Sequence, residues 1–474
     1  MGDVTINKTA ASGRSVRLQR YVSDYGMLLV LAALCVLFSV LTISEQHPTG
    51  AAAAENVFGQ IESAVPEGGS ILIVGRETAE DSEFVHVLDE HLRAAKVTII
   101  PALTGEPSVV RAGMAALDSA GRIPGFVVTT HAFSATVEMI KAQFSGFRDK
   151  SVLTPTSHKW PTFLLADNIR NVANQITVIA IIAIGMTMVI ITAGIDLSVG
   201  SMIALSAVVV AWLVGQGGGG QASTLTMMLA ALGGILFCGG VGAFSGLMIT
   251  GFRIPPFIAT LAMMQVAAGL AYIFSQGKPI YQLPDTFVWL GRGVDPLLHV
   301  PNAVILMLVL YALAHLVMTR TTFGRYIYAV GGNLEAARLA GIRVKLVLFS
   351  VYALCGMLAG LGGVVMASQL KSGAPTYGLT YELYVIAAVV VGGTSLMGGE
   401  GRILGTLIGA FIIAVIQNGM NLVNVESYTQ KVVLGLVILG AVLADRIKQK
   451  RLRPKLARPA ENKPPDTRLQ VPKA

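Results

Sequence analysis

Residues 172–216 read VANQITVIAIIAIGMTMVIITAGIDLSVGSMIALSAVVVAWLVGQ and consist of two apolar runs that meet at residues 193–201, AGIDLSVGS. No charged residue lies between Arg170 and Asp196 on the upstream side, and none lies between Asp196 and Arg253 on the downstream side. Charge-free apolar runs of about 18 residues or more are typical of membrane-spanning helices. The stretch therefore predicts two transmembrane helices that meet at Asp196.

The junction between these two helices is polar and contains glycine. Asp196 lies between Gly194 and Gly200. A carboxylate at this depth is costly unless it reaches water, a partner or backbone donors, and glycine permits the broken helix that such a site needs. Residues 392–399, GGTSLMGG, join two later apolar runs in a similar way. Paired breaks of this kind point to a translocation path, and a chance similarity of glycine-rich turns is the alternative.

The composition is that of a membrane protein. Of 474 residues, 53% are hydrophobic and only 13% are charged, whereas about 25% are charged in an average soluble domain. The net charge of +8 could indicate nucleic-acid binding, but the cations gather in the two tails and one loop, as the positive-inside rule requires. The three cysteines lie within apolar runs, which predicts neither a disulfide nor a metal site. No cofactor is expected.

The hydropathy and charge pattern predicts an all-α polytopic protein with about ten transmembrane helices and both termini in the cytoplasm. Residues 1–24 form a basic tail before the first transmembrane helix at 25–44, the remaining spans form a core at 166–448, and residues 449–474 form a second basic tail. The loop at 319–346 carries five cations against Glu335 alone, so it is expected on the cytoplasmic side. The ten expected spans cover residues 27–43, 176–193, 199–215, 224–250, 254–275, 301–318, 347–368, 384–397, 404–420 and 430–445.

Residues 45–165 have a different character and predict a small inserted α/β domain on the extracytoplasmic side. Short β-type runs at 70–74, 97–100 and 125–130 alternate with helical patterns at 83–95 and 108–119. This order implies a small parallel sheet with covering helices. Gly75 and Arg76 follow the first strand, where a ligand loop or a purely structural or docking turn are both possible. The amphipathic residues 162–175 are expected to lie on the outer membrane surface.

Motifs for catalysis are missing from the sequence. It contains no G-x-x-x-x-G-K-[ST], H-E-x-x-H or G-x-S-x-G pattern, so the chain is not expected to be an enzyme or to bind ATP phosphates itself. The cytoplasmic loop instead predicts a short helix that Asn333 caps, with Glu335 in its first turn and Gly341 after its end. Such a helix suits a contact with a partner protein, and an ordinary interfacial helix is the alternative.

Four motifs in a fixed order resemble the permease subunits of bacterial ABC importers for ribose-, xylose- and galactose-type sugars. They are AGIDLSVGS, IPPFIATLAMM, GNLEAARLAGI and YELYVIAAVVVGGTSLMGGEGRILGTLIGA. The resemblance covers about residues 165–448 and the first span. In place of the short loop of typical members, this chain has the insertion at about 45–160.

The resemblance implies a monosaccharide importer in the bacterial inner membrane. Its expected partners are cytoplasmic ATPase subunits, a periplasmic sugar-binding protein and a second permease copy in a homodimer. The helix that couples to the ATPase would contain Asn333, Glu335, Ala336, Arg338 and Gly341. The gate or translocation path would be shaped by Asp196, Ser198, Ser201, Thr394 and Ser395. Alternatively, Asp196 only caps the next helix by accepting hydrogen bonds from the amides of Val199 and Gly200.

Two other classes of function remain as alternatives. A membrane-anchored sugar sensor would use the domain at 45–165 to bind its ligand and would need no ATPase. A secondary transporter would need ionisable groups inside the membrane, and Asp196 and Glu382 are the only acidic residues near span interiors. That number is small for a proton relay.

Overall fold

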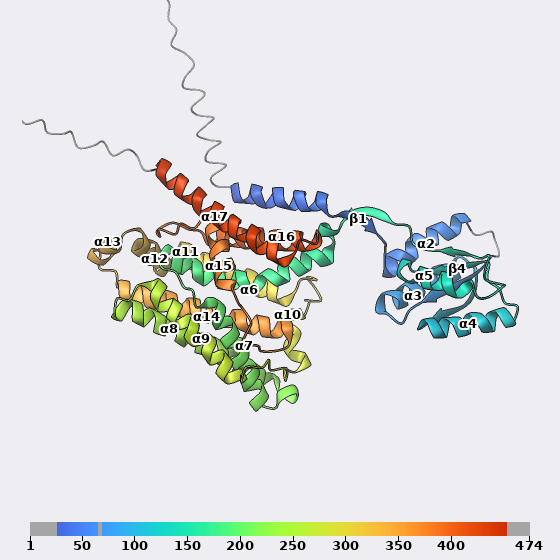
Figure 1. The fold of residues 1–474 in the computed structure, drawn as a ribbon, viewed down its shortest axis with the longest axis horizontal. Helices are drawn as coiled ribbons and strands as arrows, with labels where there is room; N and C mark the ends of the chain where they lie inside the picture. The colour runs from blue at the N-terminus through green and yellow to red at the C-terminus, as the bar shows by residue number, and fades with distance from the viewer. Residues whose placement is uncertain (1–25, 65–68, 453–474) are drawn as a thin grey trace, which may run out of the picture. The chain divides into compact units, whose positions relative to one another are not determined.

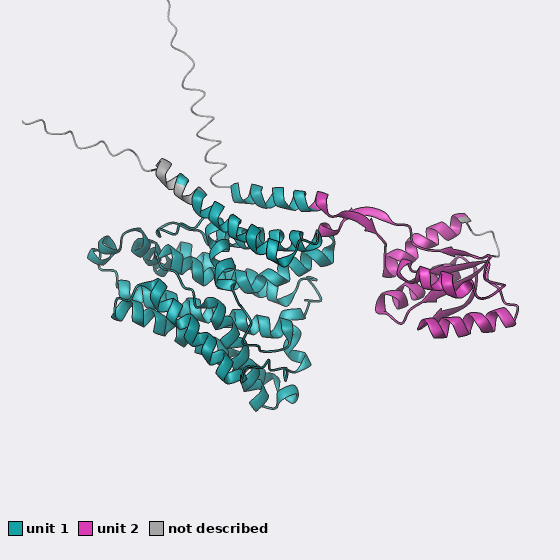
Figure 2. Cartoon of the chain, in the orientation of Figure 1, with its two compact units in different colours: residues 1–38, 165–474 teal, residues 39–164 magenta. Residues whose placement is uncertain are grey.

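The computed structural model describes residues 26–64 and 69–452 and divides the chain into two compact units (Figure 2). The first unit consists of Met1–Phe38 and Leu165–Ala474, and the second consists of Ser39–Leu164. The expected basic tail at residues 1–24 lies outside the described residues, as does all of the tail at 449–474 except its first four positions.

The first unit is a bundle of helices (Figure 1). Among the described residues, seven helices are long and apolar enough to cross a membrane: α6 (Ala166–Ile191), α7 (Val199–Gln216), α8 (Thr224–Gly251), α9 (Pro256–Ser275), α11 (Asn302–Arg320), α14 (Val344–Leu370) and α16 (Ile403–Leu422). Three shorter apolar helical segments are Gly26–Leu41, α15 (Tyr381–Val391) and Ser427–Leu443, the last within α17 (Ser427–Leu452). The short helices α10 (Trp289–Arg292), α12 (Thr322–Gly332) and α13 (Leu334–Leu339) and the 3-10 turns η2 (Gly219–Gln221) and η3 (Asp285–Val288) complete the unit.

Two expected boundaries were wrong. Residues 166–175, expected as part of a surface helix, form the first turns of α6 itself. No glycine or proline occurs between Ala166 and Gln175 to end the helix, so it continues into the span. Helix α15 ends at Val391, earlier than expected, because Gly392 and Gly393 follow and Gly393 takes a left-handed backbone conformation with φ of 85°.

Helix α6 lies at the centre of the bundle. Of its most apolar 18-residue window, 89% is buried within the chain, whereas the corresponding value for α9 is 28%. Helices α11, α12, α14, α15 and α16 pack around it. The Tyr311 hydroxyl on α11 donates a hydrogen bond to the Ala180 carbonyl on α6 over 2.9 Å. The side of α9 that is not buried is apolar, as a lipid-facing surface requires.

Close helix contacts in this unit depend on small residues. Helices α8 and α14 meet at Gly242 and Gly356, where a Cβ on Gly356 would lie 3.0 Å from the Gly242 Cα. Membrane helices commonly approach each other through such residues. The Ser206 hydroxyl on α7 donates to the Gly360 carbonyl on α14 over 2.6 Å, which fixes a third helix to the same pair.

The second unit is an α/β structure. Strands β2 (Ser70–Gly75), β3 (Thr98–Thr104), β4 (Phe126–Thr129) and β5 (Ser151–Leu153) form a parallel sheet in the order β3-β2-β4-β5. Its helices are α2 (Gly50–Ala64), α3 (Ala79–Ala94), α4 (Pro107–Ser119) and α5 (His131–Lys141). Residues of α2 and α3 pack in one apolar cluster with the sheet, and residues of α4 and α5 pack in another. The first three strands of this sheet overlap the expected strand segments.

The second unit begins and ends in a two-stranded ribbon. Strand β1 (Ile43–Gln46) pairs antiparallel with β6 (His158–Pro161), so Gln46 lies opposite His158. The 3-10 turn η1 (Thr162–Leu164) follows, and the Phe163 amide donates to the Thr42 hydroxyl over 3.1 Å. The chain therefore enters and leaves this unit at adjacent positions.

Candidate functional site

The break between α6 and α7 is closed by hydrogen bonds of its own residues. Asp196 and Ser198 are fully buried, and the Asp196 Oδ1 accepts from the Ser198 amide over 2.9 Å and from the Ser198 hydroxyl over 2.6 Å. Asp196 thus forms a turn around Ser198. The cap on the amides of Val199 and Gly200 is not formed, because Ser198 occupies the N-cap position and the hydrogen bonds that Asp196 Oδ1 accepts come from Ser198. Ser201 lies in the first turn of α7 and is partly buried.

The break between α15 and α16 is also buried. Thr394 and Ser395 are 1% and 4% exposed. The Ser395 amide donates to the Glu400 carbonyl over 3.0 Å, and its hydroxyl accepts from the Met397 amide over 3.2 Å. Among the described residues, the buried Thr394 hydroxyl has no hydrogen-bond partner.

The two breaks contact each other directly. The Gly399 amide in the second break donates a hydrogen bond to the carbonyl of Ile191, the last residue of α6, over 2.8 Å. Gly331, near the end of α12, fits between them: a Cβ at this position would overlap the Ile191 carbonyl oxygen and lie 2.7 Å from the Gly399 nitrogen. Three glycine-rich or polar segments from distant parts of the sequence therefore meet at one point.

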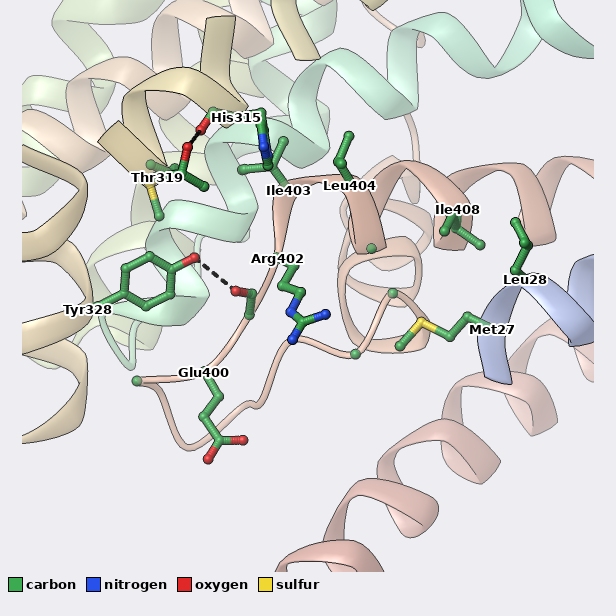
Figure 3. A pocket seen from close by; sticks show the side chains of 16 residues that line it. Met27, Leu28, His315, Thr319, Tyr328, Glu400, Arg402, Ile403, Leu404 and Ile408 are labelled. Atoms are coloured by element: carbon green, nitrogen blue, oxygen red, sulfur yellow. Dashed lines mark hydrogen bonds between the residues drawn. The ribbon is translucent and has the colours of Figure 1, made fainter. Parts of the chain in front are cut away.

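Helix α12 also contacts the second break through a side chain. The Tyr328 hydroxyl donates to the Gly401 carbonyl over 2.8 Å (Figure 3). Neither Tyr328, Gly331 nor Gly399 was predicted from the sequence as a site residue. Paired glycines at 331–332 and 398–399 were the available signal, but a pairing between them is not visible in the sequence.

The helix α13 has the local structure expected from the sequence. The Asn333 side chain accepts a hydrogen bond from the Ala336 amide over 3.0 Å. Arg338 lies 3.7 Å from Glu335, and both side chains are exposed. Gly341 follows the helix in a left-handed conformation with φ of 81°. Its apolar side chains are only partly covered, because Ala337 is buried and Leu339 is 86% exposed.

Among the described residues, no hydrogen bond or ion pair joins the five residues expected in the coupling helix to the breaks. Their connection to the breaks runs through the chain, because Asn333 follows Gly332 directly and Gly331 contacts both breaks. A displacement of α13 along this connection would therefore act first on the contact between Ile191 and Gly399.

A cavity of ≈ 810 Å³ lies beside the second break. Its labelled side chains come from four segments: the start of the helix Gly26–Leu41, the end of α11, α12, and the second break with α16 (Figure 3). His315, Glu400 and Arg402 give it titratable or charged groups, and Met27 and Ile408 give it apolar ones. The cavity therefore places polar and apolar side chains together beside the second break.

In the second unit, the loop after β2 is held by an ion pair between the partly exposed Arg76 and the buried Asp81. Arg76 donates from Nε to the Asp81 Oδ2 over 2.9 Å and from Nη2 to Oδ1 over 3.1 Å, and the Thr130 hydroxyl lies 3.3 Å from Oδ2. Burial raises the pKa of Asp81, but hydrogen bonds and charge from Arg76 lower that pKa more, so it lies below its ordinary value. This ion pair therefore fixes the position of the loop at Gly75 and Arg76.

Residues 168–442 match the protein family described as "Branched-chain amino acid transport system / permease component". This match covers more than half of the chain and includes both breaks, α12 and α13. The chain belongs to this permease family. Several curated relatives of the permease transport sugars according to their names, and the expected resemblance to sugar ABC permeases is confirmed.

The permease is 45% identical over 281 residues to the ribose import permease protein of Escherichia coli (strain K12), which covers 58% of this chain and 85% of that protein. It is 36% identical over 273 residues to the D-allose transport system permease protein of the same organism, covering 58% and 81%. It is 37% identical over 275 residues to the L-arabinose ABC transporter permease protein of Azospirillum brasilense, covering 58% and 78%. No solved structure matches the chain.

These comparisons and the apolar helices identify a multi-pass membrane protein of the sugar ABC permease type. The family match begins at residue 168, so the α/β unit at Ser39–Leu164 lies outside it.

Proposed function

We propose that this permease is the transmembrane subunit of an ATP-driven monosaccharide importer in the bacterial inner membrane. It spans the membrane about ten times with both termini in the cytoplasm, works as a homodimer and takes its energy from separate ATPase subunits. A periplasmic binding protein delivers the sugar. The names of the sugar-transporting relatives support a monosaccharide as the substrate. The absence of an ATP-binding motif in the sequence supports ATP hydrolysis by a separate subunit.

The observation that carries this proposal is the junction at Gly331. Helix α13 is exposed, short and capped at both ends, so it can bind a partner without unfolding. Three residues before it begins, Gly331 contacts the ends of both breaks. ATP-driven movement of α13 would thus reach Ile191 and Gly399 directly. We assign Asn333, Glu335, Ala336, Arg338 and Gly341 to the contact with the ATPase.

The polar residues of the breaks have the role of a gate in this proposal. Asp196 and Ser198 hold the first break in its turn, and Ser201 lies at the start of the following helix. Thr394 and Ser395 belong to the second break, where the Thr394 hydroxyl has no partner among the described residues. A buried hydroxyl without a partner costs free energy, which favours a rearrangement that gives it one. These five residues shape the translocation path. Asp196 contributes by holding the backbone of the first break in its turn.

The α/β unit supplements this function on the extracytoplasmic side. We assign it a role in docking the binding protein, because it lies outside the region shared with the family and its β1–β6 ribbon brings its own two ends together. A ligand-sensing role is the second possibility, but the Arg76–Asp81 pair occupies the loop where a ligand would bind.

Two substitutions in the coupling region test the main proposal. Glu335→Lys reverses a charge on the exposed face of α13, and Gly341→Pro blocks a conformation with positive φ because proline requires a negative value. Both variants should insert normally but hydrolyse ATP without transport. Glu426→Lys, an exposed charge reversal outside this loop, is the matched control. Normal uptake by both coupling variants would overturn the assignment of α13.

A further inference from the structure

A second cavity, of ≈ 250 Å³, lies between α6, α14, α15 and α16. Its polar lining consists of three glutamine amides and two tyrosine rings. These residues are Gln175, Gln369, Gln417, Tyr381 and Tyr384. We call this set the amide cavity. None of its residues belongs to the breaks or to α13, so the proposed function has not yet used it.

The amide cavity lies at the opposite ends of the helices from the breaks. Gln175 precedes Ile191 by sixteen residues on α6, which corresponds to about 24 Å along the helix. Gln417 lies on α16, twelve residues after Gly405 in the wall of the larger cavity, or about 18 Å. Between these ends α6 is buried along its length. A solute in the amide cavity would therefore be separated from the breaks by the closed centre of the bundle.

The polar groups of the amide cavity have spare hydrogen-bonding capacity. The Gln369 amide nitrogen donates to the Asn174 carbonyl over 2.9 Å, which fixes this side chain against α6. Within the described residues, no hydrogen bond engages the side chains of Gln175, Gln417, Tyr381 or Tyr384. Each amide offers two donors and an acceptor, and each phenol offers one donor and an acceptor. The cavity can therefore bind a solute that carries several hydroxyl groups.

The aromatic rings add a second feature. Tyr381 and Tyr384 lie with ring centroids 6.1 Å apart at an interplanar angle of 80°. Their positions on the first turn of α15 bring both rings to the cavity. Flat apolar ring faces beside amide groups complement a sugar ring, which has C–H groups on its faces and hydroxyl groups around its edge. Binding sites of this size generally combine an apolar wall with a few directed polar groups.

The lining of the amide cavity contains no charged residue. Glu382 is the nearest candidate in sequence, but its carboxylate lies against Gly200 of α7, where an added Cβ would overlap it. An amino acid carries an ammonium and a carboxylate, and each would need a charged or strongly polar partner to leave water. The cavity therefore favours a neutral polyhydroxylated solute over the branched-chain amino acids of the family description.

We propose that the amide cavity is the binding site for one neutral monosaccharide on the side of the permease that faces the binding protein. This proposal rests on the proposed function and deepens it by assigning the substrate contacts. The volume fits one small solute, since drug-sized ligands occupy sites of about 300–1,000 Å³. Gln175 and Gln417 bind hydroxyl groups, Tyr381 and Tyr384 cover a ring face, and Gln369 positions the α6 side of the cavity.

The test uses the permease reconstituted in proteoliposomes with its ATPase and binding protein. Uptake of labelled aldopentoses, aldohexoses and leucine is measured together with ATP hydrolysis. Gln175→Leu and Gln417→Leu keep the approximate side-chain size and remove the amides. Each should lower the sugar transported per ATP about tenfold and leave the maximal rate of ATP hydrolysis within twofold of wild type. The matched control is Gln221→Leu, in the exposed turn between α7 and α8.

A third variant, Tyr384→Phe, distinguishes contact with the sugar from a general effect on folding. Loss of one hydroxyl should change the ratio of uptake between two epimeric sugars more than twofold, whereas a structural defect lowers both rates equally. The uptake ratio of Tyr384→Phe also tests the sugar site if Gln175→Leu and Gln417→Leu do not fold. Equal ratios would overturn the site, as would wild-type transport per ATP by folded Gln175→Leu and Gln417→Leu. If the wild-type permease instead took up leucine and no sugar, or took up neither solute, the proposed function would be overturned.

Discussion

Addition of a single methyl group at Gly331 would disturb the contact between the two breaks. A Cβ at this position would meet both the Ile191 carbonyl and the Gly399 amide, and these two groups are themselves hydrogen-bonded over 2.8 Å. Any side chain at position 331 would separate the two breaks. A Cβ at the neighbouring Gly332 would have no atom within 4 Å, so substitution there is a control for substitution at Gly331.

We predict that Gly331→Ala impairs transport strongly and Gly332→Ala does not. An added methyl at position 331 overlaps backbone atoms that cannot rotate away, and overpacking of this kind costs about 1–3 kcal/mol or more. Uptake in the reconstituted complex should fall at least tenfold, with a lower melting temperature. Gly332→Ala should retain at least half of wild-type uptake. Equal behaviour of the two variants would contradict the contact between Gly331 and the breaks.

A second prediction concerns the pH dependence of the α/β unit. The pKa of Asp81 is lowered in the folded state, so the unfolded state binds more protons at low pH. The stabilisation is present above the ordinary pKa of an aspartate, about 4, and is lost as pH falls through the lowered folded-state pKa. Hydrogen bonds to charged groups contribute about 2 kcal/mol. Asp81→Asn should remove most of this dependence.

Hydrogen exchange measures this effect in the full-length protein. Protection factors of peptides from β2 and β4, which are corrected for the intrinsic effect of pH on exchange, should fall between pH 6 and pH 3 in the wild type. They should change much less in Asp81→Asn. Glu426→Asn, an exposed carboxylate of the first unit, is the control. If Asp81→Asn retained the wild-type slope, the ion pair would not be its source.

At the scale of helices, local signals in the sequence predicted α13 well. Asn333, Glu335 and Gly341 fix its two ends through cap interactions that involve only neighbouring residues. The same reasoning misplaced the start of α6, because amphipathicity at residues 166–175 is equally compatible with a surface helix and with the first turns of a span whose polar side faces other helices. The Asn174 amide in fact donates to the Gly291 carbonyl over 2.9 Å.

The exposed apolar side chain of α13 gives a prediction for this helix. Leu339 is 86% exposed although it belongs to a six-residue helix on a charged loop. Burial of a leucine on binding contributes about 1.5–3 kcal/mol. Leu339→Asp should therefore weaken the binding of the ATPase subunits at least tenfold while the permease itself melts at an unchanged temperature.

The control for this helix is Leu297→Asp. Leu297 is 84% exposed and lies in the loop before α11, outside the coupling region. Co-purification and titration with the ATPase subunits measure both variants. The assignment of α13 would be wrong if Leu339→Asp bound the ATPase as tightly as Leu297→Asp.

At the scale of the whole molecule, the sequence indicated which segments are apolar but not which of them meet. The positions of α7, α8, α11 and α16 follow from hydropathy alone, because a span must be long and charge-free. The contacts of Gly399 with Ile191, and of Tyr328 with Gly401, join segments far apart in the sequence. Local sequence patterns do not predict contacts between segments that are far apart in the chain. The amide cavity was missed for the same reason, since its three glutamines lie on three different helices.

The attachment of the α/β unit permits a clean deletion. Gln46 and His158 are paired residues of the β1–β6 ribbon, so residues 47–157 can be replaced by Asn-Gly, which favours a two-residue hairpin turn. The shortened permease should insert normally and transport at saturating binding protein. At limiting binding protein its uptake should fall at least fivefold, because the docking surface is gone. Unchanged uptake and affinity for the binding protein would remove the docking role.

The central claim is that the permease forms a translocation path and does not hydrolyse ATP itself. Separate ATPase subunits supply the energy by moving α13. The most direct measurement is sugar accumulation in liposomes that contain the purified permease alone, or the permease with its ATPase, binding protein and ATP. We predict accumulation against a gradient only in the complete system, including when a proton or sodium gradient is imposed on the permease alone. Concentrative uptake by the permease alone would contradict the account.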